Sequence, residues 1–250
     1  MTFIEKIKDI NRFDHILNVL FKHGFGFLIE SLRLKDRLTL NQRLDKEKFK
    51  EIDRKPEMLR KVFGELGGTF IKFAQFLSLR PDKIPLEYLK EFEKPQDNVP
   101  AIPTSEIKKI IEHELKLPLK EVFKEFSEEP VASASIAQVH KAKLKTGEEV
   151  AIKVQRPNIQ ETMERDLDLL LFFANYLEKH NHKIKGVNPI LIVNEFKEWT
   201  TKELDFKQEA SNIEVFRTNF LKSKEVLIPK TYSHLCTEKI ITMEFINGIE

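Results

Sequence analysis

The sequence has one cysteine, no long apolar run and almost no net charge, and each scarcity excludes a class of protein. Cys236 alone cannot form an internal disulfide framework, so the chain fits a reducing compartment. No run of about 18 apolar residues and no secretory signal is seen, so we expect no transmembrane helix. The 42 basic and 40 acidic residues leave a net charge of +2, so no nucleic-acid partner is expected. A cytoplasmic, helix-rich protein is the resulting prediction, with attachment to a membrane surface as an alternative.

Local patterns divide the chain into three predicted segments. Residues 1–55 contain two short amphipathic helices, interrupted at Gly24 and Gly26, and then a charged connector over residues 34–55. We interpret these helices as a hairpin that packs on the rest of the protein, and a helix on a membrane surface is the alternative. Residues 56–129 are predicted to be a helical extension, and residues 130–250 form the third segment.

One helix of the extension keeps two polar residues on an otherwise apolar stretch. A helix that begins at Pro56 has an apolar stripe at every third or fourth position. Lys72 and Gln75 lie away from this stripe and share a second face. The stripe is Leu59, Phe63, Leu66, Phe70, Phe73 and Leu77, and Ile71, Phe76 and Leu79 flank the polar pair. The second face is therefore also expected to be covered, and a covered lysine needs a partner.

The third segment changes from helical to mixed patterns. Strands are expected on both sides of the turn Lys145-Thr146-Gly147 and over residues 225–232 and 239–246. Helices are expected over residues 159–179 and, with Asn188 as the N-cap, over one long stretch to about residue 220. The whole is predicted to be an α+β fold with an antiparallel sheet and a long helix.

The strand region carries the pattern of a nucleotide site. Protein kinases cover ATP phosphates with a GxGxxGxV loop and reach them with the lysine of VAIK. VAIK occurs here at Val150 to Lys153, and the upstream loop has alanine in place of each glycine, at Ala132, Ala134 and Ala137, followed by Val139. Ala151 and Lys153 share one face of the strand, so a small side chain lies beneath adenine while the amine reaches phosphate. Three methyl groups are expected to stiffen and partly fill this loop. A plain hairpin with a solvated lysine is the alternative.

The lysine of such a site needs a glutamate on a helix. Asp205 and Glu209 are four residues apart on the predicted long helix and share a face, whereas Glu203 lies off it. We choose Glu209 as the partner of Lys153. The alternative is an acidic face exposed to solvent.

With these motifs the chain resembles the UbiB-type atypical kinases, the ubiquinone-biosynthesis group, over residues 60–250. The family signature KxGQ corresponds to Lys72-Phe73-Ala74-Gln75, and the family's ExD motif corresponds to Glu203-Leu204-Asp205. Ala74 stands where the motif has glycine, which is a departure from the pattern.

The resemblance implies a fold and an activity. In the family the signature helix folds back over the active site, so Lys72 and Gln75 would face Glu203 and Asp205 in a buried polar cluster. The implied activity is ATP or ADP binding with ATPase or small-molecule kinase chemistry in ubiquinone or other prenyl-lipid biosynthesis. The implied partners are a nucleotide, a membrane surface or prenyl lipid, and proteins of quinone biosynthesis.

The catalytic loops of the family are not found in these 250 residues. The expected His-Gly-Asp loop and the later Asp-Phe-Gly, which hold Mg²⁺ in the intact family fold, have no counterpart, so no metal site is predicted. The last residues are interpreted as a strand and hinge in which Met243 and Glu244 contact the nucleotide. We expect this chain alone to be a small lobe without phosphoryl-transfer activity. The alternative function is a non-catalytic, pseudokinase-like module that docks a partner protein or membrane.

Overall fold

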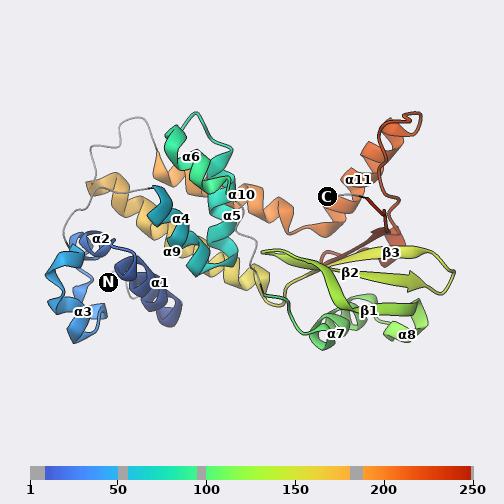
Figure 1. Ribbon diagram of the computed structural model, residues 1–250, viewed down its shortest axis with the longest axis horizontal. Coiled ribbons are helices and arrows are strands. Elements are labelled where there is room, and N and C mark those ends of the chain that lie inside the picture. Colours follow the sequence, from blue (N-terminus) through green and yellow to red (C-terminus); the bar gives the residue numbers. More distant parts are fainter. Residues whose placement is uncertain (1–8, 50–55, 95–99, 181–187, 249–250) are drawn as a thin grey trace. The chain divides into compact units, whose positions relative to one another are not determined.

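The computed structural model describes residues 9–49, 56–94, 100–180 and 188–248. The chain forms two compact units, each built from two stretches of sequence (Figure 1). Unit 1 comprises residues 1–97 and 161–197, and unit 2 comprises residues 98–160 and 198–250. These boundaries differ from those of the three segments predicted above. Across the described residues, none of the helices combines the length and the apolar character needed to cross a bilayer.

Unit 1 is helical. Its first two helices fall where the sequence predicts them, on either side of Gly24. The predicted solvated connector is not one throughout, because Leu34 and Leu38 are buried and short helices follow them. The helices are α1 (Ile10–Lys22), α2 (Gly26–Ser31), η2 (Lys35–Arg37), α3 (Leu40–Leu44), η3 (Lys46–Phe49), α4 (Pro56–Leu66), α5 (Gly68–Ser78), α6 (Leu86–Phe92) and most of α9 (Ile159–His180).

The apolar stripe predicted after Pro56 belongs to two helices rather than one. Gly67 has a φ of 73°, in the left-handed region that glycine adopts without strain, and it separates α4 from α5. Both halves of the stripe still enter one aromatic core. The ring centroids of Phe63 and Phe73 are 5.9 Å apart, and those of Phe73 and Phe196 are 5.0 Å apart.

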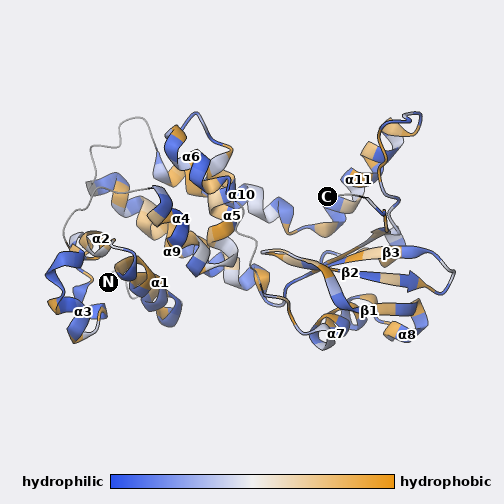
Figure 2. Ribbon diagram, viewed as in Figure 1, coloured by the Kyte–Doolittle hydropathy of each residue, from blue (hydrophilic) through white to orange (hydrophobic). Residues whose placement is uncertain are grey.

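Unit 2 contains an antiparallel sheet of four strands in the order β1-β2-β3-β4. Hydrophobic and hydrophilic residues alternate along β2 and β3 (Figure 2), so one face of the sheet enters a core and the other stays partly open. Val150, Ile152 and Val154 point to the buried face and pack with Ile107 and Ile111 of α7. The elements of unit 2 are α7 (Thr104–Leu115), α8 (Leu119–Val122), β1 (Phe123–Ser133), β2 (Ala137–Leu144), β3 (Glu149–Gln155), α11 (Phe206–Phe220), η4 (Ser233–Leu235) and β4 (Ile240–Glu244).

Two strand boundaries differ from the sequence prediction. The helical extension was predicted to run to residue 129, yet its last helix, α8, is only one turn long and β1 already begins at Phe123. Residues 225–232 were expected to form a strand, yet they contribute only an isolated bridge between Thr231 and Met243. Pro229 has no N–H to donate to a sheet, which accounts for part of this difference.

The long helix predicted to follow Asn188 is also two helices. Asn188 caps α10 (Pro189–Glu203), since its side chain accepts a hydrogen bond from the Leu191 N–H at 2.8 Å. The helix then breaks, and the Asp205 side chain caps α11 by accepting from the Gln208 N–H at 3.1 Å. The aspartate of the ExD motif is therefore an N-cap and not a residue of the helix face.

Candidate functional site

The partly open face of the sheet collects most of the residues that the kinase motifs single out. Residues directly opposite each other in an antiparallel pair point to the same face. Ala132 pairs with Val139, Val139 with Lys153, and Ala151 with Met243, while Ala151 and Lys153 are two residues apart on β3. All five side chains therefore lie on one face.

The three remaining predicted residues do not all share this face. Ala137 is buried and pairs with Gln155, which places it on the same face as Lys153. Ala134 lies in the turn between β1 and β2. Glu244 is one residue after Met243, so its side chain belongs to the opposite side of β4, where its carboxylate accepts a hydrogen bond from the Lys230 N–H. Only its backbone adjoins the predicted site.

Lys153 and Glu209 form an ion pair within unit 2. The Lys153 Nζ donates to both carboxylate oxygens of Glu209, at 2.7 and 2.8 Å. The same ammonium lies 4.6 Å from the ring centroid of Phe206, which is fully buried in the first turn of α11. The structure thus brings together the lysine and the glutamate chosen from the sequence, and their role in binding a nucleotide stays a prediction.

Gln155 fixes the start of α11, and the motifs did not point to it. Its side-chain amide donates to the Glu238 carbonyl at 3.0 Å and to the Leu204 carbonyl at the break between α10 and α11. The Phe206 N–H donates to the same Glu238 carbonyl at 3.2 Å. Because Glu209 lies one turn into α11, these bonds set where its carboxylate meets Lys153. A buried glutamine two residues after the VAIK lysine is the only signal that the sequence offered.

The alanine-rich loop is held from one side by Arg156. Its guanidinium donates to the Ala134 carbonyl, the Ser133 hydroxyl and the Pro100 carbonyl, at 2.8, 2.8 and 2.9 Å. Its backbone N–H donates to the Ile136 carbonyl at 2.9 Å. Burial lowers the pKa of the Arg156 guanidinium. Arg156 therefore fixes the loop at three points, Ser133, Ala134 and Ile136, and connects it to Pro100.

The loop also has no need for glycine. In the part of the chain that the structure describes, positive φ among non-glycine residues occurs at Arg33, Lys116 and Asn158, outside this loop. The Ala134 N–H donates to the Ala137 carbonyl at 2.9 Å and closes the turn in an ordinary conformation. Alanine is thus compatible with this backbone.

A cavity of about 630 Å³ lies beside the ion pair, within unit 2. Its walls combine the two partners of that pair with polar residues of α11 and with the last turns of α10. The lining residues are Lys153, Trp199, Lys202, Glu203, Gln208, Glu209 and Asn212. Its volume falls within the range of about 300 to 1,000 Å³ that is typical of small-molecule sites.

The two polar motifs lie in different units. Lys72 and Gln75 are on α5 in unit 1, whereas Glu203 and Asp205 are in unit 2, so the polar cluster expected between them stays a prediction. The prediction that the second face of α5 is covered is wrong for two positions, because Gln75 is exposed and Leu79 is 70% exposed. Ala74, the departure from the motif, is fully buried.

The described residues hold no group of three or more histidine, cysteine, aspartate or glutamate side chains placed to bind a metal ion. The polar groups at the cavity are two ammonium groups, two carboxylates and two side-chain amides, from Lys153, Lys202, Glu203, Glu209, Gln208 and Asn212.

A four-stranded antiparallel sheet whose central lysine pairs with a glutamate of an adjacent helix defines a kinase-like small lobe. The family model of the ABC1 atypical kinase-like domain matches residues 94–250. The chain belongs to this family.

Named relatives agree with this assignment. The chain is 44% identical over 192 residues to "Protein ACTIVITY OF BC1 COMPLEX KINASE 1, chloroplastic" of Arabidopsis thaliana, and it covers 28% of that protein with 76% of its own length. It is 40% identical over 193 residues to "Probable protein kinase UbiB" of Cellvibrio japonicus, with 77% of this chain and 35% of that protein aligned. An uncharacterized Clostridium pasteurianum protein, from the 5′ region of hydrogenase 1, is 41% identical over 96% of this chain and 42% of its own.

A solved structure shares the fold. It is a Mycobacterium tuberculosis protein in complex with erythromycin, 31% identical, with a TM-score of 0.51 over 75% of this chain and 47% of that one. The chain therefore spans between about a quarter and a half of the length of the proteins that it matches.

Proposed function

We propose that this chain supplies the lysine–glutamate half of a nucleotide site in an atypical kinase or ATPase. The observation that carries the proposal is the ion pair between Lys153 and Glu209, with Nζ–O distances of 2.7 and 2.8 Å beside an open cavity. In kinases the lysine of this pair contacts ATP phosphates and the helix glutamate holds it in place. Here Gln155 holds the helix that carries the glutamate.

The residues present fit a nucleotide in three respects. The Lys153 ammonium offers hydrogen-bond donors to phosphate oxygens, and only 22% of its side chain is exposed. Ala151, Val139 and Met243 form a half-buried, mostly apolar surface on the same face, against which adenine would lie. Glu209 keeps the lysine extended toward the cavity instead of into solvent. ATP or ADP is the cofactor that this set suits, and it supplies the phosphoryl group.

The biological role that we propose is support of ubiquinone or other prenyl-lipid biosynthesis. The support is family membership and the resemblance of relatives such as the Cellvibrio "Probable protein kinase UbiB". A membrane surface, a prenyl lipid and proteins of quinone biosynthesis are the partners that belong to this role. Because the chain covers only part of those relatives, the whole protein's substrate and activity belong to the same proposal.

The test is a titration of the full 250-residue chain with a fluorescent ATP analogue. We expect weak binding, with a Kd above about 10 µM, since a half-enclosed site buries only part of the nucleotide. Lys153→Ala should weaken binding at least about tenfold, because a hydrogen bond to a charged group contributes about 1.5 to 3 kcal/mol.

Lys239→Ala is the matched control. Lys239 also pairs with a helix glutamate, Glu114 on α7, at 3.2 Å, but α7 packs on the other face of the sheet. This variant should bind the analogue as the parent does. Equal affinity of the parent and Lys153→Ala would contradict the nucleotide proposal and favour a non-catalytic docking module.

A further inference from the structure

The start of α5 in unit 1 is open on the side from which a ligand would approach. Gly67 and Gly68 have φ values of 73° and 28°, and the N-cap residue Gly67 has no side chain that could accept a hydrogen bond from the first turn of this 11-residue helix. A Cβ atom placed on either glycine would meet no atom within 4 Å. A helix N-terminus with unsatisfied N–H groups and open space in front of it favours an anion.

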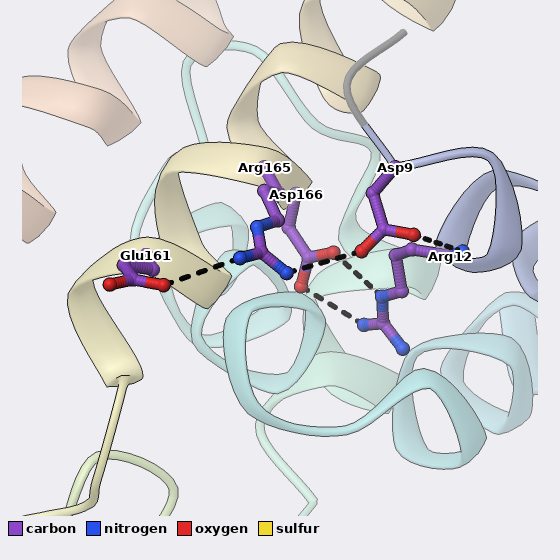
Figure 3. A network of polar contacts seen from close by, with 5 residues as sticks. All are labelled: Asp9, Arg12, Glu161, Arg165 and Asp166. Atoms are coloured by element: carbon purple, nitrogen blue, oxygen red, sulfur yellow. Dashed lines mark hydrogen bonds and ion pairs between the residues drawn. The ribbon is translucent and has the colours of Figure 1, made fainter.

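A cavity of about 260 Å³ lies at this helix start. Its lining includes two arginines, and both are held in place by carboxylates rather than left mobile. The Nε and Nη2 atoms of Arg12 donate to the two carboxylate oxygens of Asp166, at 2.7 and 2.9 Å, and Nη2 also donates to the Leu66 carbonyl at 3.0 Å. Figure 3 shows the remaining guanidinium nitrogen of Arg12 turned away from Asp166. The lining residues are Asp9, Arg12, Leu66, Gly68, Thr69, Thr162, Arg165 and Asp166.

Thr69 supplies a second and independent observation. It is the second residue of α5, its side chain is fully buried, and it lines the cavity. Within residues 9–49, 56–94, 100–180 and 188–248, its hydroxyl Oγ1 has no hydrogen-bond partner. A buried hydroxyl without a partner is unfavourable, so a ligand that accepts a hydrogen bond from it would recover that cost.

The carboxylates at the cavity are already engaged. Asp166 is occupied by Arg12, and Asp9 accepts from the Arg12 backbone N–H at 2.9 Å and from Arg165 at 3.2 Å. Glu161 accepts from the other terminal nitrogen of Arg165, at 3.2 Å (Figure 3). The charges of the two lining arginines and two lining aspartates cancel. Among the described residues, the surplus at the site therefore consists of donors: the first N–H groups of α5, the Thr69 hydroxyl and the Arg12 nitrogen that faces away from Asp166.

We propose that this cavity binds a phosphate group. A phosphate has acceptor oxygens on every side, so one group can meet a helix start, a hydroxyl and a guanidinium edge at once. The size of the cavity suits a small anion or the head of a phosphate monoester rather than a drug-sized ligand, for which sites start near 300 Å³. The site is separate from Lys153 and is independent of the proposed nucleotide function.

The experiment is a calorimetric titration of the full chain with inorganic phosphate and, separately, with glycerol 3-phosphate, at constant ionic strength in chloride buffer. Thr69→Val keeps the shape of the side chain and removes only the hydroxyl. We expect it to weaken phosphate binding about tenfold, and to leave the phosphate-free protein at least as stable as the parent. Thr69→Ser should restore most of the affinity.

Two controls separate this site from other causes. Thr200→Val removes another buried hydroxyl that has no partner among the described residues but lines neither cavity, so affinity should not change. Lys153→Ala removes the nucleotide lysine and should leave this phosphate response intact.

Tighter binding of glycerol 3-phosphate would identify an ester headgroup as the ligand, and tighter binding of inorganic phosphate would identify the free anion. No saturable heat with either probe up to about 10 mM, or equal affinity in Thr69→Val, would overturn the proposal.

Discussion

The two units each contain a long-range ion pair with nearly the same lengths but different surroundings. In unit 1 Arg12 pairs with Asp166, and in unit 2 Lys153 pairs with Glu209. The two cationic side chains are equally exposed, at 22%, while the carboxylates differ: Asp166 is 0% exposed and Glu209 is 34% exposed. The difference between the pairs therefore lies in how much water the anion retains.

This difference separates a structural contact from one that a ligand can rearrange. Removing the cation from a fully buried carboxylate leaves an uncompensated charge, which costs about 3 to 5 kcal/mol. When the carboxylate still contacts water, removal of its partner lowers the free energy of unfolding by about 1 kcal/mol or less. The fork of Arg12 also matches both oxygens of Asp166, whereas the Lys153 ammonium is a compact charge that can turn to another acceptor. Only the second pair is suited to exchange its partner for a phosphate.

The largest expected effect is the contrast between Arg12→Ala and Lys153→Ala. Urea unfolding followed by circular dichroism should show Arg12→Ala destabilising unit 1 by about 3 to 5 kcal/mol, and Lys153→Ala costing about 1 kcal/mol or less. Replacing Arg12 and Asp166 together by leucine should recover much of the loss, because no buried charge remains. Equal small losses in both single variants would show that burial of the anion does not control these pairs.

An intermediate effect is expected at Gln155. Gln155→Leu keeps the bulk of the side chain but leaves the Leu204 and Glu238 carbonyls without their amide donor. The unfolding free energy should fall by about 1 to 3 kcal/mol, and the start of α11 should become less well fixed. Amide hydrogen exchange in the first turn of α11 should accelerate more than exchange in α7. A uniform change across unit 2 would mean that Gln155 acts on general packing and not on the helix that carries Glu209.

The smallest effect is a pH dependence that arises from a buried polar network without charge. The imidazole of His140 is fully buried, its Nδ1 lies 3.0 Å from the Ser127 carbonyl, and its Nε2 lies 2.9 Å from the Gln138 amide nitrogen. The carbonyl can only accept and the amide nitrogen can only donate, so the ring is neutral with its proton on Nδ1. Burial lowers the pKa of His140, against the opposing effect of the Ser127 carbonyl.

A lowered pKa in the folded state sets the sign of this dependence. The contribution of His140 to the free energy of unfolding is complete above its unfolded-state pKa of about 6.5. It is lost as the pH falls through the lower pKa of the folded state. Urea unfolding measured over this pH range should show that the free energy of unfolding changes less steeply with pH in His140→Gln than in the parent. His113→Gln is the control, because the side chain of His113 is 74% exposed. An unchanged slope in His140→Gln would contradict this assignment.

Motif spacing predicted the fold class and the meeting of Lys153 with Glu209, since both depend on residue types at fixed distances along the chain. The turn at Gly147 and the strands beside it followed from local chemistry. The break at Asp205 was missed because an aspartate inside an apparently continuous helical pattern has no local mark that makes it a cap. Only the bond of its side chain to the Gln208 N–H shows this role.

Other residues escaped prediction because most of their partners are backbone carbonyls from distant parts of the chain. Gln155 and Arg156 follow VAIK directly, yet what they hold is decided by the packing of residues 100, 133–136, 204 and 238 around them. Carbonyl groups are the same in every residue, so no sequence pattern indicates which of them a side chain will reach. The strand predicted over residues 225–232 failed for the opposite reason: its composition favours a strand, but most of its backbone finds no partner strand.

Trp199 gives the cavity beside Lys153 a built-in optical probe. It is the only tryptophan in the 250 residues, it is half-buried, and it lines that cavity. Indole emission selected by excitation near 295 nm therefore comes from one place in the molecule, a wall of this one cavity. A ligand that enters there will shift or quench the emission without any label.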